Sequence, residues 1–347
     1  MVAALAKELA LRKVEFSDQV VETIYFGGGT PSVLSITEIQ FLISTVYEHY
    51  NVVAHPEITL EANPDDLSDL KIQELAASPV NRLSIGIQSF FDDDLKLMNR
   101  AHNAIEAQKS LAYATRYFDN ISIDLIYGIP GMSNSRWTEI IKIALGFKIS
   151  HISSYALTVE PKTALKKLIA TGKIAAPQDD TASEHFEILV STLTKEGFIH
   201  YELSNFGKEN YFSKNNSSYW LGKKYLGIGP SAHSYNGTAR SWNVSNNTLY
   251  LKSIENNVLP SETEILSITD QYNEYVMTGL RTIWGISIPK VAVEYGSNYE
   301  SYLLKQAQKF IDDGLLVIDH MVIKTTRKGK FLCDGIASDL FMLNLDQ

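Results

Sequence analysis

The first half of the chain alternates short apolar runs with longer stretches in which apolar residues recur every three or four positions. The short runs are typical of buried strands, and the longer pattern is typical of amphipathic helices. Because strands that alternate with helices build βαβ units, we expect a parallel sheet. Five strands are predicted, at residues 23–26, 57–60, 82–87, 121–126 and 151–157.

Residues 1–160 are therefore expected to form one α/β domain. Five strands in about 160 residues suit an open or partial barrel, since a closed eight-fold barrel takes about 250 residues. The helix that follows the first strand is predicted to begin with Thr37 as its cap.

The chain opens on a predicted helix, residues 3–13, where the alternating order would put a strand. No Ser, Thr, Asp or Asn precedes this helix to cap it. Two explanations stay open on periodicity alone. Either a first strand and its loop precede the sequence given, or the domain starts with a helix.

The second half of the chain has no such alternation. Residues 161–265 are predicted to extend the barrel, beginning with a linker-like stretch at 162–178 and a helix at 180–196. Residues 198–247 are rich in Tyr, Ser, Asn and Gly and predict short strands.

A separate unit is expected over residues 266–347. It contains two predicted helices, 270–282 and 299–313, and then a strand pair, 315–318 and 321–325. This order indicates a winged-helix-like α+β domain. A basic run at Lys324 to Lys330 is interpreted as a solvated wing and not as a DNA contact, because the domain is acidic overall.

Composition narrows the class of protein. The chain has 31 Lys and Arg against 40 Asp and Glu, a net charge of −9, which disfavours a nucleic-acid or anionic-membrane surface. No apolar run reaches the ~18 residues of a membrane span, and no signal peptide is evident, so a cytoplasmic protein is expected. The single cysteine, Cys333, excludes an internal disulfide and a cluster held by this chain's own thiolates.

Polar or glycine-rich motifs follow the predicted strands at their C-terminal ends. Ligands bind at these ends in parallel α/β folds, because the loops converge there. A set of such motifs at successive strand ends therefore predicts a site. The motifs are GGGTP (27–31), EANP (61–64), SIGIQSF (84–90), DLIYGIPG (124–131) and YAL (155–157).

With these motifs in order, the chain resembles the oxygen-independent coproporphyrinogen III oxidase family of radical S-adenosylmethionine (SAM) proteins. It looks closest to the short branch of heme chaperones, and the resemblance covers nearly the whole chain. It rests on YFGGGTPS (25–32), EITLEANP (57–64), NRLSIGIQSF (81–90), DLIYGIP (124–130), YELSNF (201–206) and YLGIG (225–229). The fold that the resemblance implies is a partial (β/α)6-type radical SAM barrel with the winged-helix-like domain behind it.

The resemblance also implies a SAM site. A zwitterionic ligand with a ribose needs backbone dipoles, a cation for its carboxylate and a carboxylate for its amine or hydroxyls. The matching positions are Gly28, Gly29 and Thr30 of the glycine loop, the polar residues Glu61, Gln88, Arg100 and Asp124, and the backbone or apolar contacts Ile126 and Ala156.

Purely structural roles remain open for three of these residues. Arg100 could form a surface salt bridge, Asp124 could cap the end of its strand, and Gln88 could be a buried amide that satisfies loop backbone. His102 is expected to orient the loop beside this site.

One departure from the family concerns the iron–sulfur cluster. Family members carry a CxxxCxxC loop that holds a [4Fe–4S] cluster, where SAM is bound and cleaved to a radical. This chain has no such loop. We expect an N-terminally truncated chain that lacks the first strand and the cluster loop, with a natural cluster-less relative as the alternative. The chain as given is expected to be catalytically inactive and to bind SAM weakly.

A second departure concerns heme. The chaperone branch carries an HNxxYW motif, which here reads NNSSYW (215–220), so an amide replaces the imidazole at the first position. Asn216, Tyr219 and Trp220 are candidate heme or substrate contacts, although the two aromatic residues could equally anchor a domain junction. His233 is a further candidate heme ligand, with a hydrogen-bonded loop histidine as the structural alternative.

The expected function is heme binding and delivery to an acceptor protein such as a respiratory enzyme. The alternative, for an intact protein, is the oxidative decarboxylation of coproporphyrinogen III to protoporphyrinogen IX, with SAM and a [4Fe–4S] cluster as cofactors. A third and weaker option is another radical SAM reaction.

Overall fold

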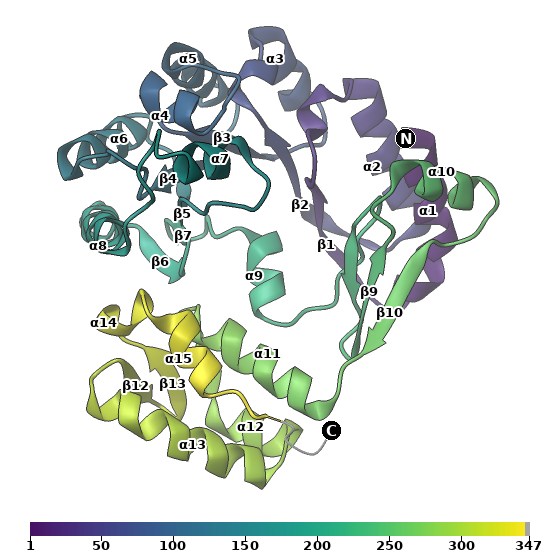
Figure 1. Cartoon of the computed structure of the whole chain (residues 1–347). Coiled ribbons are helices and arrows are strands. Elements are labelled where there is room, and N and C mark those ends of the chain that lie inside the picture. Colours follow the sequence, from purple (N-terminus) through teal and green to yellow (C-terminus); the bar gives the residue numbers. More distant parts are fainter. Residues whose placement is uncertain (344–347) are drawn as a thin grey trace.

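The computed structural model describes residues 1–343, and its largest element is a seven-stranded sheet with the order β1-β2-β3-β4-β5-β7-β6 (Figure 1). β1 to β5 are parallel and the sheet curls into a half-barrel, so the predicted partial α/β barrel is confirmed. The hairpin of β6 and β7 adds two strands, with β7 antiparallel to β5. The strands are Val21–Phe26 (β1), Val52–Ala62 (β2), Arg82–Gln88 (β3), Ile121–Tyr127 (β4), His151–Ala156 (β5), Ile199–Glu202 (β6) and Asn205–Gly207 (β7).

Helices cover the outer face of the sheet (Figure 1). The strands contribute buried residues such as Leu60, Leu83 and Ile123, which pack against helix residues such as Leu111 and Trp137. Burying one such side chain stabilises the fold by about 1.5–3 kcal/mol. The helices of this half are α2 (Ile36–His49), α3 (Asp69–Ala76), α4 (Asp92–Leu97), α5 (Ala104–Ala114), α6 (Asn134–Gly146), α7 (Ala164–Ala170) and α8 (Asp179–Lys195).

The opposite face of the same strands is polar. Side chains alternate between the two faces of a strand, so each apolar residue of the core has a polar neighbour that points into the half-barrel. This is unusual, because parallel strands are normally apolar on both faces. The inward residues are Tyr25 on β1, Thr59 and Glu61 on β2, Arg82 and Ser84 on β3, Ser122 and Asp124 on β4, and His151 and Ser153 on β5.

A second, three-stranded antiparallel sheet has the order β10-β9-β8. It follows α9, which lies in the opening of the half-barrel (Figure 1). The first helix, α1, packs against α10 of this region as well as against α2. The elements are α1 (Val2–Arg12), α9 (Lys214–Trp220), β8 (His233–Tyr235), β9 (Ala239–Asn243), α10 (Asn247–Glu255) and β10 (Ser261–Ile265).

The fully buried Glu8 of α1 joins the N-terminal helix to this second sheet. Its carboxylate accepts hydrogen bonds from Gly229 N at 2.8 Å, Asn243 Nδ2 at 2.7 Å and the Tyr250 hydroxyl at 2.6 Å. Arg12 contacts the same carboxylate at 3.4 Å. Segments more than 200 residues apart in the sequence are therefore held together by one buried charge.

The C-terminal unit has its own core, which includes Tyr272, Val276, Leu303 and Ile323. Its three-stranded sheet, β11-β13-β12, packs with helices as expected for a winged-helix-like domain. Its elements are α11 (Ile268–Leu280), β11 (Ile286–Ser287), α12 (Ile288–Glu294), α13 (Ser297–Asp312), β12 (Leu316–Asp319), β13 (Val322–Thr325), α14 (Arg327–Lys330) and α15 (Cys333–Asp339).

The basic run was predicted to be a solvated wing; Arg327 and Lys328 are exposed, but the run does not form the wing. The turn between β12 and β13 lies at His320 and Met321, before the run. Arg327 pairs with Glu187 of α8 at 2.8 Å, and Lys330 donates to the His200 carbonyl of β6 at 3.1 Å. Arg327 and Lys330 therefore bind the half-barrel, while Lys324 and Lys328 bind Asp319 and the Asp313 carbonyl of their own unit.

Two other local predictions need correction. The cap of α2 is Ser35, which forms a capping box with Glu38, because its side chain reaches the third helical residue while Thr37 already lies inside the helix. The linker-like stretch contains α7, which Thr163 caps. No helix within residues 1–343 has both the length and the apolar composition needed to cross a membrane.

We expect Glu8→Ala to lower the free energy of unfolding by about 3 kcal/mol, because Asn243, Tyr250 and the Gly229 N–H would lose a buried partner. Urea unfolding followed by circular dichroism measures this loss. Glu15→Ala is the matched control, since Glu15 binds the same Arg12 at 2.7 Å but is exposed. A loss of under about 1 kcal/mol is expected there, and equal losses in the two variants would contradict the role of Glu8.

Candidate functional site

Tyr25 and Glu61 meet on the polar face, near the C-terminal ends of β1 and β2. The Tyr25 hydroxyl donates to Glu61 Oε1 at 2.7 Å. Gly27 passes so close that a Cβ there would lie 2.6 Å from the Tyr25 ring and 2.9 Å from the Glu61 carboxyl group. Burial, with the Glu61 charge, raises the pKa of Tyr25 far above its usual range, so the phenol remains a hydrogen-bond donor.

Asp124 occupies the same interior from β4, opposite Ser153 of β5. Burial, and secondarily the charge of Glu61, raises the pKa of Asp124 to about 7. The positive charges of Arg100 and Arg82 act in the opposite direction. The carboxyl group therefore changes its protonation near neutral pH. Its pKa responds to the charges of Glu61 and Arg100, which are both predicted site residues.

Gln88 and Arg100 converge above Gly86 of β3. A Cβ on Gly86 would lie 3.0 Å from Gln88 Nε2 and 3.2 Å from Arg100 Nη2, so glycine leaves room for both side chains. Arg100 also donates to Asn63 Oδ1 at 3.0 Å. The salt-bridge alternative for Arg100 is therefore not what the structure contains, since its partner is an amide at the strand ends.

Gln88 has a backbone φ of 64°, in the left-handed region that non-glycine residues rarely adopt. Such a residue costs about 1–3 kcal/mol and persists where its surroundings impose it. Buried His102 supports the same turn, because its Nε2 lies 3.1 Å from the Ile87 carbonyl. This agrees with the prediction that His102 orients the loop.

The glycine loop lies apart from these contacts. Gly28, Gly29 and Thr30 are exposed, and a Cβ on either glycine would meet nothing within 4 Å. Ile126 lies two residues beyond Asp124 on β4, while exposed Ala156 ends β5. The structure thus brings Glu61, Gln88, Arg100 and Asp124 together, and leaves the loop open at the same end of the sheet.

The N-terminus of α9 is anchored inside the half-barrel. The buried carboxylate of Glu57 accepts from the backbone N–H groups of Lys214 at 3.2 Å and Asn215 at 3.1 Å. The Thr23 hydroxyl donates to Asn215 Oδ1 at 3.1 Å. Asn216 donates its N–H to the cap residue Ser213 at 3.2 Å. The first positions of the NNSSYW motif therefore hold the helix in place.

The aromatic end of α9 faces other aromatic rings. Tyr219 is 45% exposed and makes an edge-to-face contact with Tyr225 at 4.7 Å between centroids. Tyr225 in turn packs near Tyr235 of β8 at 6.1 Å. Trp220 lies under the guanidinium of Arg281, 5.2 Å from its ring centroid. We call Tyr219, Trp220, Tyr225 and Tyr235 the aromatic cluster.

His233 lies at the start of β8, on the second sheet. It is exposed, and its ring centroid is 6.1 Å from that of Trp242 on β9. The backbone of His233 lies in close contact with Gly227, where a Cβ would lie 2.1 Å from the His233 carbonyl oxygen. The imidazole thus pairs with Trp242 and not with the aromatic end of α9.

Arg281 links the C-terminal unit to the half-barrel. Its guanidinium contacts Glu202 of β6 at 3.4 Å and Asp334 of α15 at 2.6 Å. Its carbonyl accepts from Leu203 N at 2.8 Å. Burial raises the pKa of Glu202, and Asn205 and Arg281 counter this effect by stabilising its charged form.

The comparisons with known proteins identify the family. Residues 3–144 match the Radical SAM superfamily and residues 266–332 match the HemN C-terminal domain. The heme chaperone HemW of Lactococcus lactis is 34% identical over 331 residues, which cover 92% of this chain and 87% of that protein. This chain belongs to the HemN-like radical SAM family, close to HemW. The HemW protein of Bacillus subtilis is 33% identical over 336 residues, 95% of this chain and 88% of that protein.

The fold of the family is also seen in a solved structure. The Escherichia coli coproporphyrinogen III oxidase HemN, a radical SAM enzyme, superposes with a TM-score of 0.83 at 22% identity, over 98% of this chain and 82% of that chain. At this level of identity the likeness concerns the fold. The match to the Radical SAM superfamily and the similarity to HemW, and not this likeness, show that the protein is a heme-related member of the radical SAM superfamily.

Membership in this family implies SAM and a [4Fe–4S] cluster in intact members. The residues on the polar face fit SAM, since they bring a carboxyl group with a raised pKa, a guanidinium and an amide together near the C-terminal ends of the strands. A cluster does not fit the residues described. Cys333 is 1% exposed in α15, and residues 1–343 contain no group of three side chains able to hold a metal ion.

Several site residues were missed in the sequence, namely Tyr25, Asn63 and the fully buried Arg82. A signal for Tyr25 and Arg82 was present, because β1 to β5 alternate polar with apolar residues. Strand prediction from apolar runs ignores this alternation. Asn63 follows β2 in the EANP motif, but only the fold brings it to Arg100.

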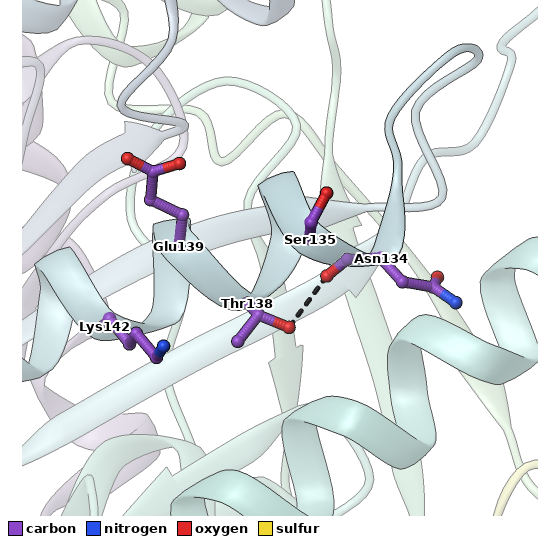
Figure 2. Close-up of a pocket in the computed structure, with 5 residues that line it drawn as sticks. All are labelled: Asn134, Ser135, Thr138, Glu139 and Lys142. Atoms are coloured by element: carbon purple, nitrogen blue, oxygen red, sulfur yellow. Dashed lines mark hydrogen bonds between the residues drawn. The ribbon is translucent and has the colours of Figure 1, made fainter.

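Two pockets on the outer surface are lined by none of the residues predicted to bind SAM. One, of about 440 Å³, follows the exposed side of α6 and is lined by Asn134, Ser135, Thr138, Glu139 and Lys142 (Figure 2). The Thr138 hydroxyl there donates to the Asn134 carbonyl at 2.7 Å, within the helix itself. The chemistry of the site therefore lies on the polar face of the sheet.

The raised pKa of Asp124 predicts how stability changes with pH. Its pKa is about 7 in the folded state and about 3.9 in the unfolded state. The folded state therefore holds the proton more tightly, and stability falls as the pH rises through this interval. We expect Asp124→Asn to stabilise the protein more at pH 8 than at pH 5, as measured by urea unfolding.

Asp119→Asn, which removes an exposed carboxylate near the start of β4, is the matched control. A stabilisation by Asp124→Asn that is independent of pH would contradict the raised pKa.

Proposed function

We propose that this protein binds heme and hands it to an acceptor protein. The observation that carries the proposal is the 34% identity to the Lactococcus lactis heme chaperone across 92% of this chain. The matched region includes the barrel, α9 and the C-terminal unit, so the similarity extends over all three parts of this chain.

The aromatic cluster is the surface that we propose for heme. A porphyrin is flat and apolar with two carboxylates, so it needs aromatic faces and nearby cations. Tyr219 and Trp220 supply the faces. Lys223 and Lys224, which follow α9 after Leu221 and Gly222, supply cations, and within residues 1–343 their ion pairs are exposed ones with Glu22 and Asp18. Such pairs are weak and can exchange for a propionate.

Asn216 and His233 receive different roles. The backbone N–H of Asn216 binds the cap residue Ser213, so we propose that Asn216 helps to position the two aromatic residues and does not contact heme. His233 is the exposed imidazole of the second sheet, and its place beside Trp242 makes it a secondary candidate for iron coordination.

We also propose that Glu61, Gln88, Arg100 and Asp124 hold SAM, with the backbone of Gly28, Gly29 and Thr30 and the contacts of Ile126 and Ala156. SAM brings a cationic sulfonium, an amine, a carboxylate and a ribose. Arg100 is suited to the carboxylate, and charged Asp124 is suited to the amine or to the hydroxyls. Tyr25 keeps Glu61 oriented through its 2.7 Å hydrogen bond.

Oxidation of coproporphyrinogen III is the alternative function. It depends on a cluster for which residues 1–343 offer no ligand set. Expression of the complete open reading frame, followed by anaerobic reconstitution and incubation with coproporphyrinogen III, distinguishes the two functions. Formation of protoporphyrinogen IX would contradict the chaperone proposal, whereas stable heme uptake without this product would support it.

Heme titrated into the full chain is expected to give a saturable Soret band. Tyr219→Ala combined with Trp220→Ala is expected to weaken heme binding at least tenfold, about 1.4 kcal/mol, because the aromatic faces are lost. Tyr117→Ala is the control, since Tyr117 is also 45% exposed but lies after α5. Unchanged affinity in the double variant would remove the aromatic cluster from the proposal, and absence of heme binding by the native chain would overturn it.

Isothermal titration with SAM tests the polar face. Asp124→Ala and Gln88→Ala are each expected to reduce SAM affinity about tenfold. Because the pKa of Asp124 is about 7, native SAM binding should strengthen from pH 6 to pH 8 as the carboxylate becomes charged. Asp124→Ala should remove this pH dependence, while Asp119→Ala should retain it. A pH dependence that survives in Asp124→Ala would contradict the assignment.

A further inference from the structure

β10 forms the outer edge of the second sheet and pairs on one side only, with β9 (Figure 1). All five of its residues are exposed. Ile265 is 82% exposed, and Ile268, just after the strand, is also exposed. Edge strands of this kind are templates for the addition of another strand.

The register shows which backbone groups of β10 are free. Antiparallel pairs alternate between hydrogen-bonded and non-hydrogen-bonded positions. Val244 N donates to the Pro260 carbonyl and Leu266 N donates to the Thr238 carbonyl, so the even-numbered residues of β10 bond to β9. The N–H and C=O groups of Ser261, Thr263 and Ile265 therefore point away from the sheet, and no described residue pairs with them.

The side chains of this edge are acidic. Glu262 and Glu264 lie on one face of β10, and neither has an ion pair within residues 1–343. Arg240, the cross-strand neighbour of Glu264, is instead paired with Glu274 of α11 at 3.0 Å. Two carboxylates two residues apart are thus left without a cation.

A shallow pocket continues this face. It has a volume of about 460 Å³ and lies between β9, β10 and the start of α10. Glu262, Trp242 and His233 form one row across the three strands and line it together. A carboxylate beside an indole ring is a suitable place for a guanidinium, which can form an ion pair and stack on the ring.

The charges of Glu262 and Glu264 argue against a second copy of this chain as the partner that pairs with the free edge of β10. An antiparallel pair of two β10 strands centred on Thr263 would place Glu262 of one copy opposite Glu264 of the other. Like charges directly opposite one another destabilise a strand pair. A strand with basic residues at alternate positions would instead face both carboxylates.

From these observations we propose that β10 is a docking edge, to which a partner protein adds an extended segment with arginine or lysine at alternate positions. The segment bonds to the outward groups of Ser261, Thr263 and Ile265, and its basic side chains pair with Glu262 and Glu264. Strand addition gives affinity through main-chain hydrogen bonds and specificity through alternate side chains. This inference goes beyond heme binding and does not depend on it.

The probe is a labelled seven-residue peptide that alternates arginine with valine, with blocked ends, added to the full chain at physiological salt. Fluorescence anisotropy is expected to show saturable binding. Thr263→Pro should weaken it about tenfold, because the outward N–H is lost while the ladder to β9 is kept. Thr263→Val keeps the N–H and is the matched control, with binding expected to remain unchanged.

Charge reversal tests whether basic side chains of the partner pair with Glu262 and Glu264. Glu262→Lys with Glu264→Lys should abolish binding of the arginine peptide and create binding of a peptide that alternates glutamate with valine. Hydrogen exchange should slow over residues 259–266 when the arginine peptide binds the native chain.

Equal binding to Thr263→Pro and the native chain would overturn the proposal, as would protection confined to other segments or an absence of peptide binding. A dimer that Thr263→Pro dissociates in sedimentation would also overturn it in favour of self-pairing. Heme titration of Thr263→Pro should match the native chain, so this proposal and the heme proposal fail separately.

Discussion

The alternation of apolar and polar residues along the parallel strands is the constraint on which the rest of this structure depends. Outward residues such as Ile58 and Leu83 build the core with the helices, and this places Glu61, Asp124 and their neighbours inside the half-barrel. A buried polar group without a hydrogen bond costs about 1–3 kcal/mol. The interior must therefore be satisfied by other parts of the chain or by a polar ligand.

The polar side chains at the two ends of the strands obtain their hydrogen-bond partners in different ways. Near the N-terminal ends, distant segments supply the partners. Glu57 binds the backbone of α9, and His151 lies between Ser122 and Tyr201 at 2.7 Å from each. Near the C-terminal ends, Asp124 keeps a raised pKa beside Glu61. One end is thus closed by the protein itself, and the other has the electrostatic character of a ligand site.

Local patterns account for what could be predicted from the sequence. The five parallel strands and the convergence of Glu61, Gln88 and Asp124 follow from periodicity and from the rule that strand ends meet at one edge. The partners of Glu8 could not be predicted in this way, because its carboxylate binds Gly229, Asn243 and Tyr250 across more than 200 residues. The contact of Lys330 with β6 is of the same kind, since a basic run alone does not indicate whether it faces solvent or protein.

Arg281 connects the interior of the half-barrel to the aromatic cluster. Burial raises the pKa of Glu202, and Asn205 and Arg281 oppose this effect by stabilising the charged form. The same guanidinium stacks over Trp220 and binds Asp334 of the C-terminal unit. Trp220 is therefore linked through Arg281 to the buried carboxylate of Glu202, while Glu57 holds the other end of the same helix, and neither link could be read from the sequence around Trp220.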